Sequence, residues 1–300
     1  MPLPPIRLRA TRQEAGSGVY VFRLNEIPIA EGTLPLDAIL VLAAAEKLQA
    51  QGFAAEATLH PDGTPAAWIP RDRADWISTS GSPALTIEEV MLAHLYLVLR
   101  RHAHEFITLQ ETQILLDGLE RTHPALVREV VPKLISPVLL TDVLRRLAEE
   151  GVSLRPLKEI LGALAEWAAH ERDPVALTEH ARAALRRAIT FQHAQAAGAN
   201  DRTLGVFLID PMIEDAIRDS IQRTASGSYL ALEPDLSREI IRRVGDTVAN
   251  TKRPVLLTAS DVRRFVRRLV ETEFPEIAVL SYQELSPDAK LQPLGRVQIG

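Results

Sequence analysis

Two short segments contain side chains that could bind a metal ion or transfer a proton, at 102–105 and 170–171. The first reads His-Ala-His-Glu, and histidine is a common zinc ligand. On a helix, residues two positions apart point about 200° apart, so His102 and His104 cannot share one ion as a pair four positions apart can. Neither segment continues with the spacing of a zincin motif. We therefore predict no metal site.

Other signatures of catalytic sites are also missing from the sequence. It contains no phosphate-binding loop, and no dinucleotide-binding glycine pattern follows a predicted strand. Ser153 lacks the second glycine of a nucleophile elbow, so we interpret it as a turn or N-cap residue. The absence of cysteine excludes disulfides, thiolate nucleophiles and cysteine-ligated zinc. We predict no catalytic residue and no cofactor. The alternative is an unrecognised metal-dependent or acid/base hydrolase that uses the histidine-rich helix.

Charge also limits the functions open to this chain. The 34 Lys and Arg residues against 39 Asp and Glu give a net charge of −5, so no excess positive field attracts nucleic acid or an anionic membrane. One predicted helix does carry a row of arginines: Arg263, Arg264, Arg267 and Arg268. Because acidic residues flank this row, we interpret it as a face that is solvated or forms salt bridges with another subunit.

The hydropathy pattern predicts a soluble chain. The longest uninterrupted apolar run extends only from Ala38 to Ala45, whereas a membrane-spanning helix needs about 18 to 20 apolar residues. The first five residues lack the basic and apolar regions of a signal peptide. They are equally compatible with the cut end of a longer protein.

The first hundred residues mix signals for strands and helices. A hairpin is predicted over 19–29, because β-branched and aromatic residues follow a Gly-Ser-Gly turn. Helix-forming residues predict a helix over 36–51, and a short strand is expected at 66–69. A linker is expected at 78–83, followed by a helix from Thr86 to about residue 107.

Beyond residue 108 the pattern is first helical and then alternates. Amphipathic stripes predict packed helices over 109–189, one of them opened by Asp173-Pro174. After a boundary at 196–201, strands are expected at 206–209, 255–257, 277–280 and 295–299, with helices at 211–224, at 234–250 and from 260. Crossovers of this kind favour parallel pairing. The predicted fold class is a mixed α/β chain of several subdomains, in which small α/β units precede a helical middle and a C-terminal α/β subdomain with a mostly parallel sheet.

Several segments resemble a known family in their order and spacing. In the helical middle they are EVVP at 129–132, LTDVLRRLAEEGV at 140–152 and EILGALAEW at 159–167, followed by segments at 173–174, 177–179 and 182–185. Outside it they are LNEIPIAEG at 24–32, segments at 105–106 and 110–117, and VLSYQELS at 279–286. Together they resemble the cytoplasmic domain of the type III secretion export-gate family, SctV and its flagellar relative FlhA. Pro156 and Gly162 depart from the usual family pattern.

The resemblance implies both an architecture and a role. Family members have an N-terminal membrane domain, absent here, and a cytoplasmic domain of four subdomains. On this chain the subdomains would be 1–44 with 79–108, an inserted 45–78, a helical 109–190 and a final 197–300. The domain forms a nonameric ring at the cytoplasmic face of the bacterial inner membrane, where secretion substrates, chaperones, gatekeeper proteins and other export apparatus proteins dock. The family is not known for hydrolytic chemistry.

Two sets of residues are the candidate contact sites. For docking we single out the surroundings of the inserted unit, namely Asp62, Thr64, Trp68 and Ile69, because an apolar cleft flanked by turns can accept a chaperone helix. Ordinary core packing is the alternative for Trp68. For contacts between subunits we single out mixed-sign residues of the helical middle: Arg145, Arg146, Glu149, Glu150, Arg155, Lys158 and Glu159. A plain adaptor that forms no ring is a further alternative.

Overall fold

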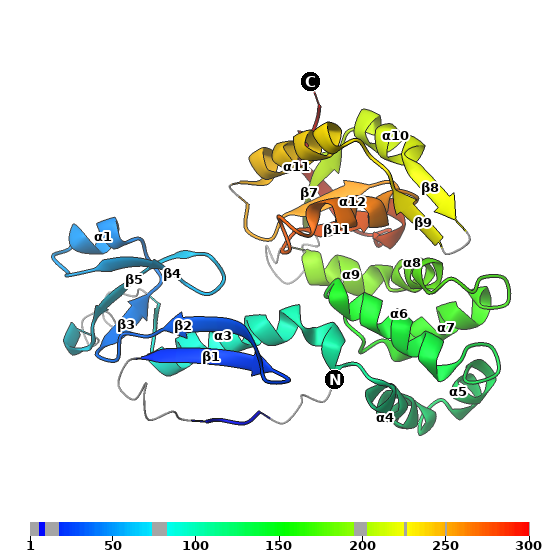
Figure 1. Cartoon of the computed structure of the whole chain (residues 1–300), viewed down its shortest axis with the longest axis horizontal. Helices are drawn as coiled ribbons and strands as arrows, with labels where there is room; N and C mark the ends of the chain where they lie inside the picture. Colours follow the sequence, from blue (N-terminus) through cyan, green and yellow to red (C-terminus); the bar gives the residue numbers. More distant parts are fainter. Residues whose placement is uncertain are drawn as a thin grey trace. The chain divides into compact units, whose positions relative to one another are not determined.

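The structure is a computed structural model of the chain, shown in Figure 1. It describes residues 6–9, 18–73, 83–194, 203–224, 227–249 and 251–299. The chain divides into two compact units, one ending at Phe106 and the other beginning at Ile107. We call them the N-terminal unit and the C-terminal unit. The predicted subdomain boundaries are finer than this division and stay a prediction.

The N-terminal unit contains a hairpin, an antiparallel sheet and short and long helices. Its elements are β1 (Val19–Leu24), β2 (Ile27–Thr33), β3 (Ala38–Val41), α1 (Ala45–Gln49), β4 (Glu56–Leu59), β5 (Pro65–Pro70), η2 (Arg71–Arg73), β6 (Ala84–Leu85), α3 (Ile87–Arg101) and η3 (Ala103–Phe106). The sheet has the strand order β4-β5-β3-β6, and every pair in it is antiparallel.

The predicted hairpin is confirmed in β1 and β2. Asn25 and Glu26 connect the strands and have positive φ angles of 50° and 68°, as a tight two-residue hairpin turn requires. The hairpin packs on α3 through Tyr20, whose hydroxyl lies 2.6 Å from Nδ1 of His94. The rings of Tyr20 and His94 meet edge to face. This contact joins two segments that are distant in the sequence.

The predicted helix over 36–51 is wrong in its first half. Ala38–Val41 forms the central strand β3, and only Ala45–Gln49 is helical. Ile39, Leu40 and Val41 are all buried. A continuous apolar run does not distinguish a buried strand from a buried helix, and here the pairing with β5 and β6 selects the strand.

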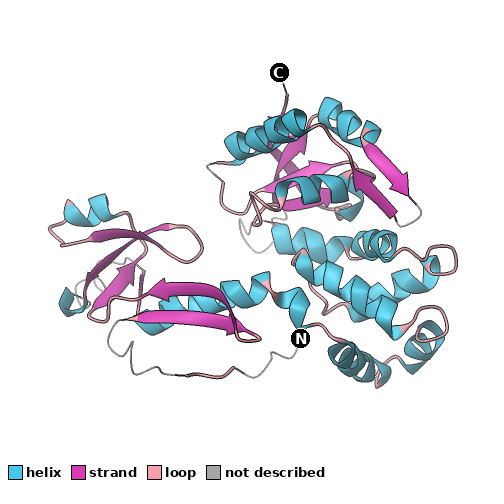
Figure 2. Cartoon of the chain, in the orientation of Figure 1, coloured by secondary structure: helices cyan, strands magenta, loops and turns pink. Residues whose placement is uncertain are grey.

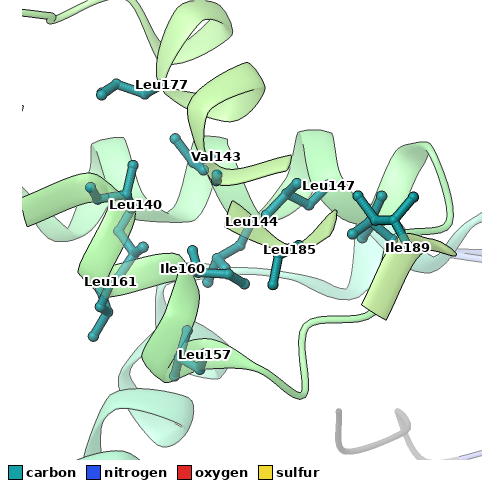
Figure 3. Close-up of a cluster of buried hydrophobic side chains, with 14 of the residues drawn as sticks. Leu140, Val143, Leu144, Leu147, Leu157, Ile160, Leu161, Leu177, Leu185 and Ile189 are labelled. Carbon is teal, nitrogen blue, oxygen red and sulfur yellow. The ribbon is translucent and has the colours of Figure 1, made fainter. Parts of the chain in front are cut away.

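The C-terminal unit begins with a helical bundle. Its helices are α4 (Leu109–Glu120), α5 (Pro124–Val130), α6 (Pro137–Glu149), α7 (Leu157–Trp167), α8 (Pro174–Ala184) and α9 (Arg186–His193). Figure 3 shows leucine, isoleucine and valine side chains of α6, α7, α8 and α9 meeting in one cluster. The predicted start of α8 is confirmed, because the Asp173 carboxylate accepts a hydrogen bond of 3.0 Å from the Val175 amide and Pro174 occupies the first turn.

The chain then alternates between strands and helices, as Figure 2 shows. The elements are β7 (Thr203–Ile209), α10 (Pro211–Asp219), β8 (Ile221–Thr224), β9 (Gly227–Leu230), α11 (Pro234–Val248), β10 (Val255–Thr258), α12 (Arg263–Val270), β11 (Ala278–Ser281), η4 (Tyr282–Glu284) and β12 (Lys290–Val297). The predicted parallel sheet is confirmed, with the order β11-β10-β7-β12 and every pair parallel.

Both faces of this sheet are covered. From β7, Leu204 and Val206 belong to the same hydrophobic cluster as the bundle helices. Phe207 and Ile209 belong to a second cluster with α10, α11 and α12. Alternate residues of a strand point to opposite faces, so β7 connects the two cores. The bundle and the sheet therefore share buried surface within one compact unit.

Some predicted boundaries differ from the structure. The helix predicted over 211–224 ends at Asp219, and Ile221–Thr224 forms β8 in a hairpin with β9. The helix expected to reach residue 107 ends at Arg101, and the one expected from 260 begins at Arg263. Helix ends depend on caps and neighbouring contacts that periodicity does not capture. Residues 78–82 of the linker predicted at 78–83, and the boundary predicted at 196–201, lie outside the described residues.

Candidate assembly and docking surfaces

The turn between β4 and β5 presents a fixed carboxylate. Asp62 accepts hydrogen bonds from the Thr64 amide at 3.0 Å and from the Thr64 hydroxyl at 2.5 Å, and it lies 2.7 Å from Nδ1 of His60. Partial burial opposes ionisation, but the hydrogen bonds from Thr64 and the nearby His60 outweigh it and hold the pKa of Asp62 well below its usual range. Asp62 is exposed, so a negative charge of defined position is available to a partner.

The other two predicted docking residues lie on β5 and face opposite sides of the sheet. Trp68 is half-buried and packs against a cluster that includes Leu40 and Val90. Ile69 is 1% exposed and belongs to a different cluster, with Ile39 and Leu48. The structure thus brings Asp62 and Thr64 together but separates Trp68 from Ile69. Their role in docking stays a prediction.

The residues predicted for contacts between subunits fall into different environments. Arg145 is exposed, and its Nε donates to the Ile107 carbonyl oxygen at 2.5 Å. Arg146 lies 3.2 Å from the carboxylate of Asp142 one turn earlier. Glu149 is exposed, whereas Glu150 directs both carboxylate oxygens into the chain. This set is not one uniform surface.

The charged residues around the start of α7 form a more open group. Arg155, Lys158 and Glu159 are all exposed. Within the described ranges none of them has an ion-pair partner. Charges that a chain leaves unpaired on its surface are available for pairing with another copy or with a partner protein.

An ion network that sequence analysis missed lies between the bundle and the sheet. Arg263 of α12 is 0% exposed. Its guanidinium donates to both oxygens of Glu150, at 2.6 and 3.0 Å, and to both oxygens of Glu179, at 2.5 and 2.7 Å. Arg182 of α8 is also buried and donates to Glu284 at 2.5 Å and to Glu150 at 3.1 Å. We call these five residues the buried ion network.

The charges within this network support one another. Burial alone would raise the pKa of Glu150, but the positive charges of Arg182 and Arg263 outweigh it and lower that pKa to about 2. Burial likewise disfavours the charged form of Arg263, yet Glu150 and Glu179 raise its pKa well above the ordinary value. Glu150 and Arg263 are therefore both charged at neutral pH.

This network corrects one interpretation of the sequence. The arginine row of α12 was expected to be solvated or to pair between subunits, which is wrong for Arg263, because its partners belong to the same chain. Arg263 lies three and seven positions before Val266 and Val270, which are buried. Its position on the apolar face of the helix could have predicted from the sequence that it is buried.

The histidines singled out in the sequence take part in local contacts. Nδ1 of His102 lies 2.5 Å from the carboxylate of Glu105, which joins the end of α3 to η3. Among the residues that the structure describes, no three His, Asp or Glu side chains are grouped as metal ligands. In the same residues, no helix combines the length and apolar character needed to span a bilayer.

Comparisons with known proteins agree with this architecture. A family model described as the FHIPEP family matches residues 1–290. The low calcium response locus protein D of Yersinia pestis is 35% identical over 99% of the chain, and the chain spans 42% of that protein, less than half its length. The Chlamydia pneumoniae CdsV chain in the CdsV and CdsO complex is 37% identical, with a TM-score of 0.90 over 99% of this chain and 85% of that one. The nonameric SctV-C of EPEC is 32% identical, with a TM-score of 0.80 over 99% of this chain and 88% of that one.

Proposed function

This chain belongs to the FHIPEP family, and we propose that it forms the ring-shaped cytoplasmic part of a type III secretion export gate, where it docks proteins for export. The predicted resemblance to the export-gate family is thereby confirmed. The observation that carries the proposal is the overlap of almost the whole chain with an SctV-C structure that is described as nonameric. Two other similar proteins support a role in secretion: HrcV of Ralstonia nicotianae is named a secretion protein, and the nonameric EscV cytosolic domain is described as part of the type III secretion system.

A closed ring needs two different patches on each copy, one of which meets the other on the next copy. We place one patch at the exposed charges around α7, namely Arg155, Lys158 and Glu159, continued by Arg145, Arg146 and Glu149 of α6. The lack of ion-pair partners for the first three within the described residues supports this choice. Glu150, already bound to Arg182 and Arg263, would act by positioning the end of α6 rather than by direct contact.

For cargo we propose the β4–β5 turn of the N-terminal unit. Asp62 and Thr64 offer a fixed carboxylate, and Trp68 offers a half-buried aromatic surface. Ile69 would support this site from within the core. Chaperones in complex with their substrates, and gatekeeper proteins, are the expected occupants. Attachment to the membrane would come through a domain outside this sequence.

The ring is tested by light scattering and negative-stain imaging over a wide range of protein concentration. We expect closed oligomers at high concentration, and we expect Lys158→Glu to shift the concentration needed for them upward. Arg238→Glu is the matched control, because Arg238 is exposed on α11 and pairs within its own helix. A chain that stays monomeric at every concentration, yet copurifies with partners, would instead favour the non-ring adaptor.

Docking is tested by titrating the protein with a purified chaperone and substrate complex from the same secretion system. We expect Asp62→Ala and Trp68→Ala to weaken binding without changing ring formation. Unchanged binding in both variants would refute this site. Metal analysis of the purified protein addresses the hydrolase alternative, because tight stoichiometric metal that is lost in His102→Ala would favour an enzyme.

A further inference from the structure

A hollow of about 300 Å³ lies on the surface of the C-terminal unit, beside α9. Arg187, Ala188, Thr190 and Phe191 of α9 line it, together with Ser286 in the segment after η4. We call it the α9 hollow. Its volume is at the lower end of the range for ligand pockets, so it can hold one or two side chains rather than a large ligand.

The polar side chains that line the α9 hollow, Thr190 and Ser286, have hydrogen-bond partners within the chain. The Thr190 hydroxyl donates to the Glu284 carbonyl oxygen at 3.3 Å and accepts from the Ser286 amide at 2.8 Å. The Ser286 hydroxyl donates to the carboxylate of Asp288. Because these polar groups already have partners, an apolar side chain could fill the hollow without leaving them unpaired.

One side of the hollow carries an exposed aromatic ring. Phe191 is 76% exposed, although most of its surface is hydrocarbon. A single exposed apolar side chain needs no explanation on most surfaces. Here, however, the ring borders a preformed hollow that also contains Ala188, an arrangement that can surround an inserted side chain.

The charge beside the hollow is positive, and no described carboxylate pairs with it. Arg186 and Arg187 occupy the first turn of α9 and are exposed. Neither has an ion-pair partner in the part of the chain that the structure describes. Two neighbouring arginines without a described ion-pair partner favour a partner that brings a carboxylate.

We propose that the α9 hollow binds a peptide segment of a partner protein, in which an apolar side chain is flanked by acidic residues. The apolar side chain enters the hollow against Phe191, and a carboxylate beside it pairs with Arg187. These two residues are four positions apart on α9 and so lie on the same side of the helix. The site is separate from the β4–β5 turn, and its binding does not depend on the proposed ring.

The test uses the full chain and fluorescently labelled synthetic peptides, with fluorescence anisotropy as the readout. The first peptide contains a leucine flanked by glutamates. In a second peptide lysines replace the glutamates, and in a third serine replaces the leucine. We expect only the first to bind the unaltered protein, and we expect its affinity to fall at high salt, because exposed charge pairs are screened.

Variants assign the binding to individual residues. Phe191→Ser and Arg187→Glu should each lower the affinity for the acidic peptide by about tenfold or more, as the loss of an interface anchor does. Arg187→Glu should gain binding of the lysine peptide. Tyr96→Ser and Arg121→Glu are matched controls, because both residues are exposed elsewhere on the chain, and neither should change binding.

Several outcomes would overturn the proposal. These are no binding of the acidic peptide, equal binding of the lysine peptide to the unaltered protein, or variants that bind like the controls. A change of oligomeric state in Phe191→Ser, with unchanged peptide binding, would identify the hollow as a contact between copies instead. Ring formation is measured on the same samples, so failure here is distinguishable from failure of the proposed function.

Discussion

Replacing Arg263 by methionine should destabilise the C-terminal unit more than any exchange of a surface charge. Methionine keeps much of the length of the side chain, so the change mainly removes a charge and its hydrogen bonds. Four of those bonds join Arg263 to two carboxylates, Glu150 and Glu179. Both carboxylates then lose their hydrogen bonds to Arg263 while their side chains stay mostly buried.

The size of the expected destabilisation depends on which partners and how much solvent each carboxylate keeps. Removing one partner of a buried ion pair costs about 3–5 kcal/mol, because the other charge stays buried. Glu150 still has Arg182 at 3.1 Å, and the Glu179 side chain is partly open to solvent. We therefore expect the free energy of unfolding to fall by about 3 kcal/mol, the lower limit of this range. Arg263→Lys keeps the positive charge but not the planar guanidinium group, so it should lower the free energy of unfolding by less.

The assay is urea unfolding at neutral pH, followed by far-UV circular dichroism, whose signal comes largely from the helices of the C-terminal unit. Arg238→Met is the control, since its exposed pair with Asp235 contributes at most about 1 kcal/mol. Adding Glu179→Gln to Arg263→Met should recover part of the loss. If Arg263→Met cost no more than the control, the buried ion network would contribute nothing to stability.

Other substitutions test separate parts of the fold by the same unfolding assay. Burial lowers the pKa of His94 below its ordinary value of about 6.5, so the unfolded chain binds a proton that the folded chain does not, and stability should fall as the pH drops below that value. His94→Gln, which keeps a partner for Tyr20, should reduce this dependence, and an unchanged pH profile would contradict the assignment. Leu144 is 0% exposed in the bundle core, and Leu144→Ala should cost about 2–5 kcal/mol; a loss below that range would mean that the site collapses. Asp173→Ala should cost about 1 kcal/mol through the lost cap of α8, whereas no loss would show that Pro174 alone suffices.

Residues close together in the sequence were enough to predict a helix wherever it has a clear apolar stripe and a capping residue. Asp173 and Asp210 each precede a proline and cap a helix through their own side chains, so α8 and α10 start where the sequence places them. Both features depend only on residues within one helical turn of each other. The parallel sheet followed from the alternation of strands with helices.

Non-local pairing explains what sequence reasoning missed. Ala38–Val41 becomes a strand because β5 and β6 pair with it, and nothing within the segment shows those partners. The buried ion network joins Arg263 to acids 84 and 113 positions away. Charge type alone cannot tell such a pair from a solvated face, although the apolar neighbours of Arg263 on α12 do point inward.

The surfaces proposed for contacts between subunits and for peptide binding belong to one body. The bundle shares a core with one face of the sheet, and α10, α11 and α12 pack on the other face. The buried ion network connects α6, α8 and α12. A substitution within that core or network would disturb α7 and α9 together, so a binding defect in Arg263→Met could not be assigned to either surface. Exposed residues such as Lys158 and Phe191 have no such coupling, since neither belongs to the core. Their variants can therefore separate the two surfaces.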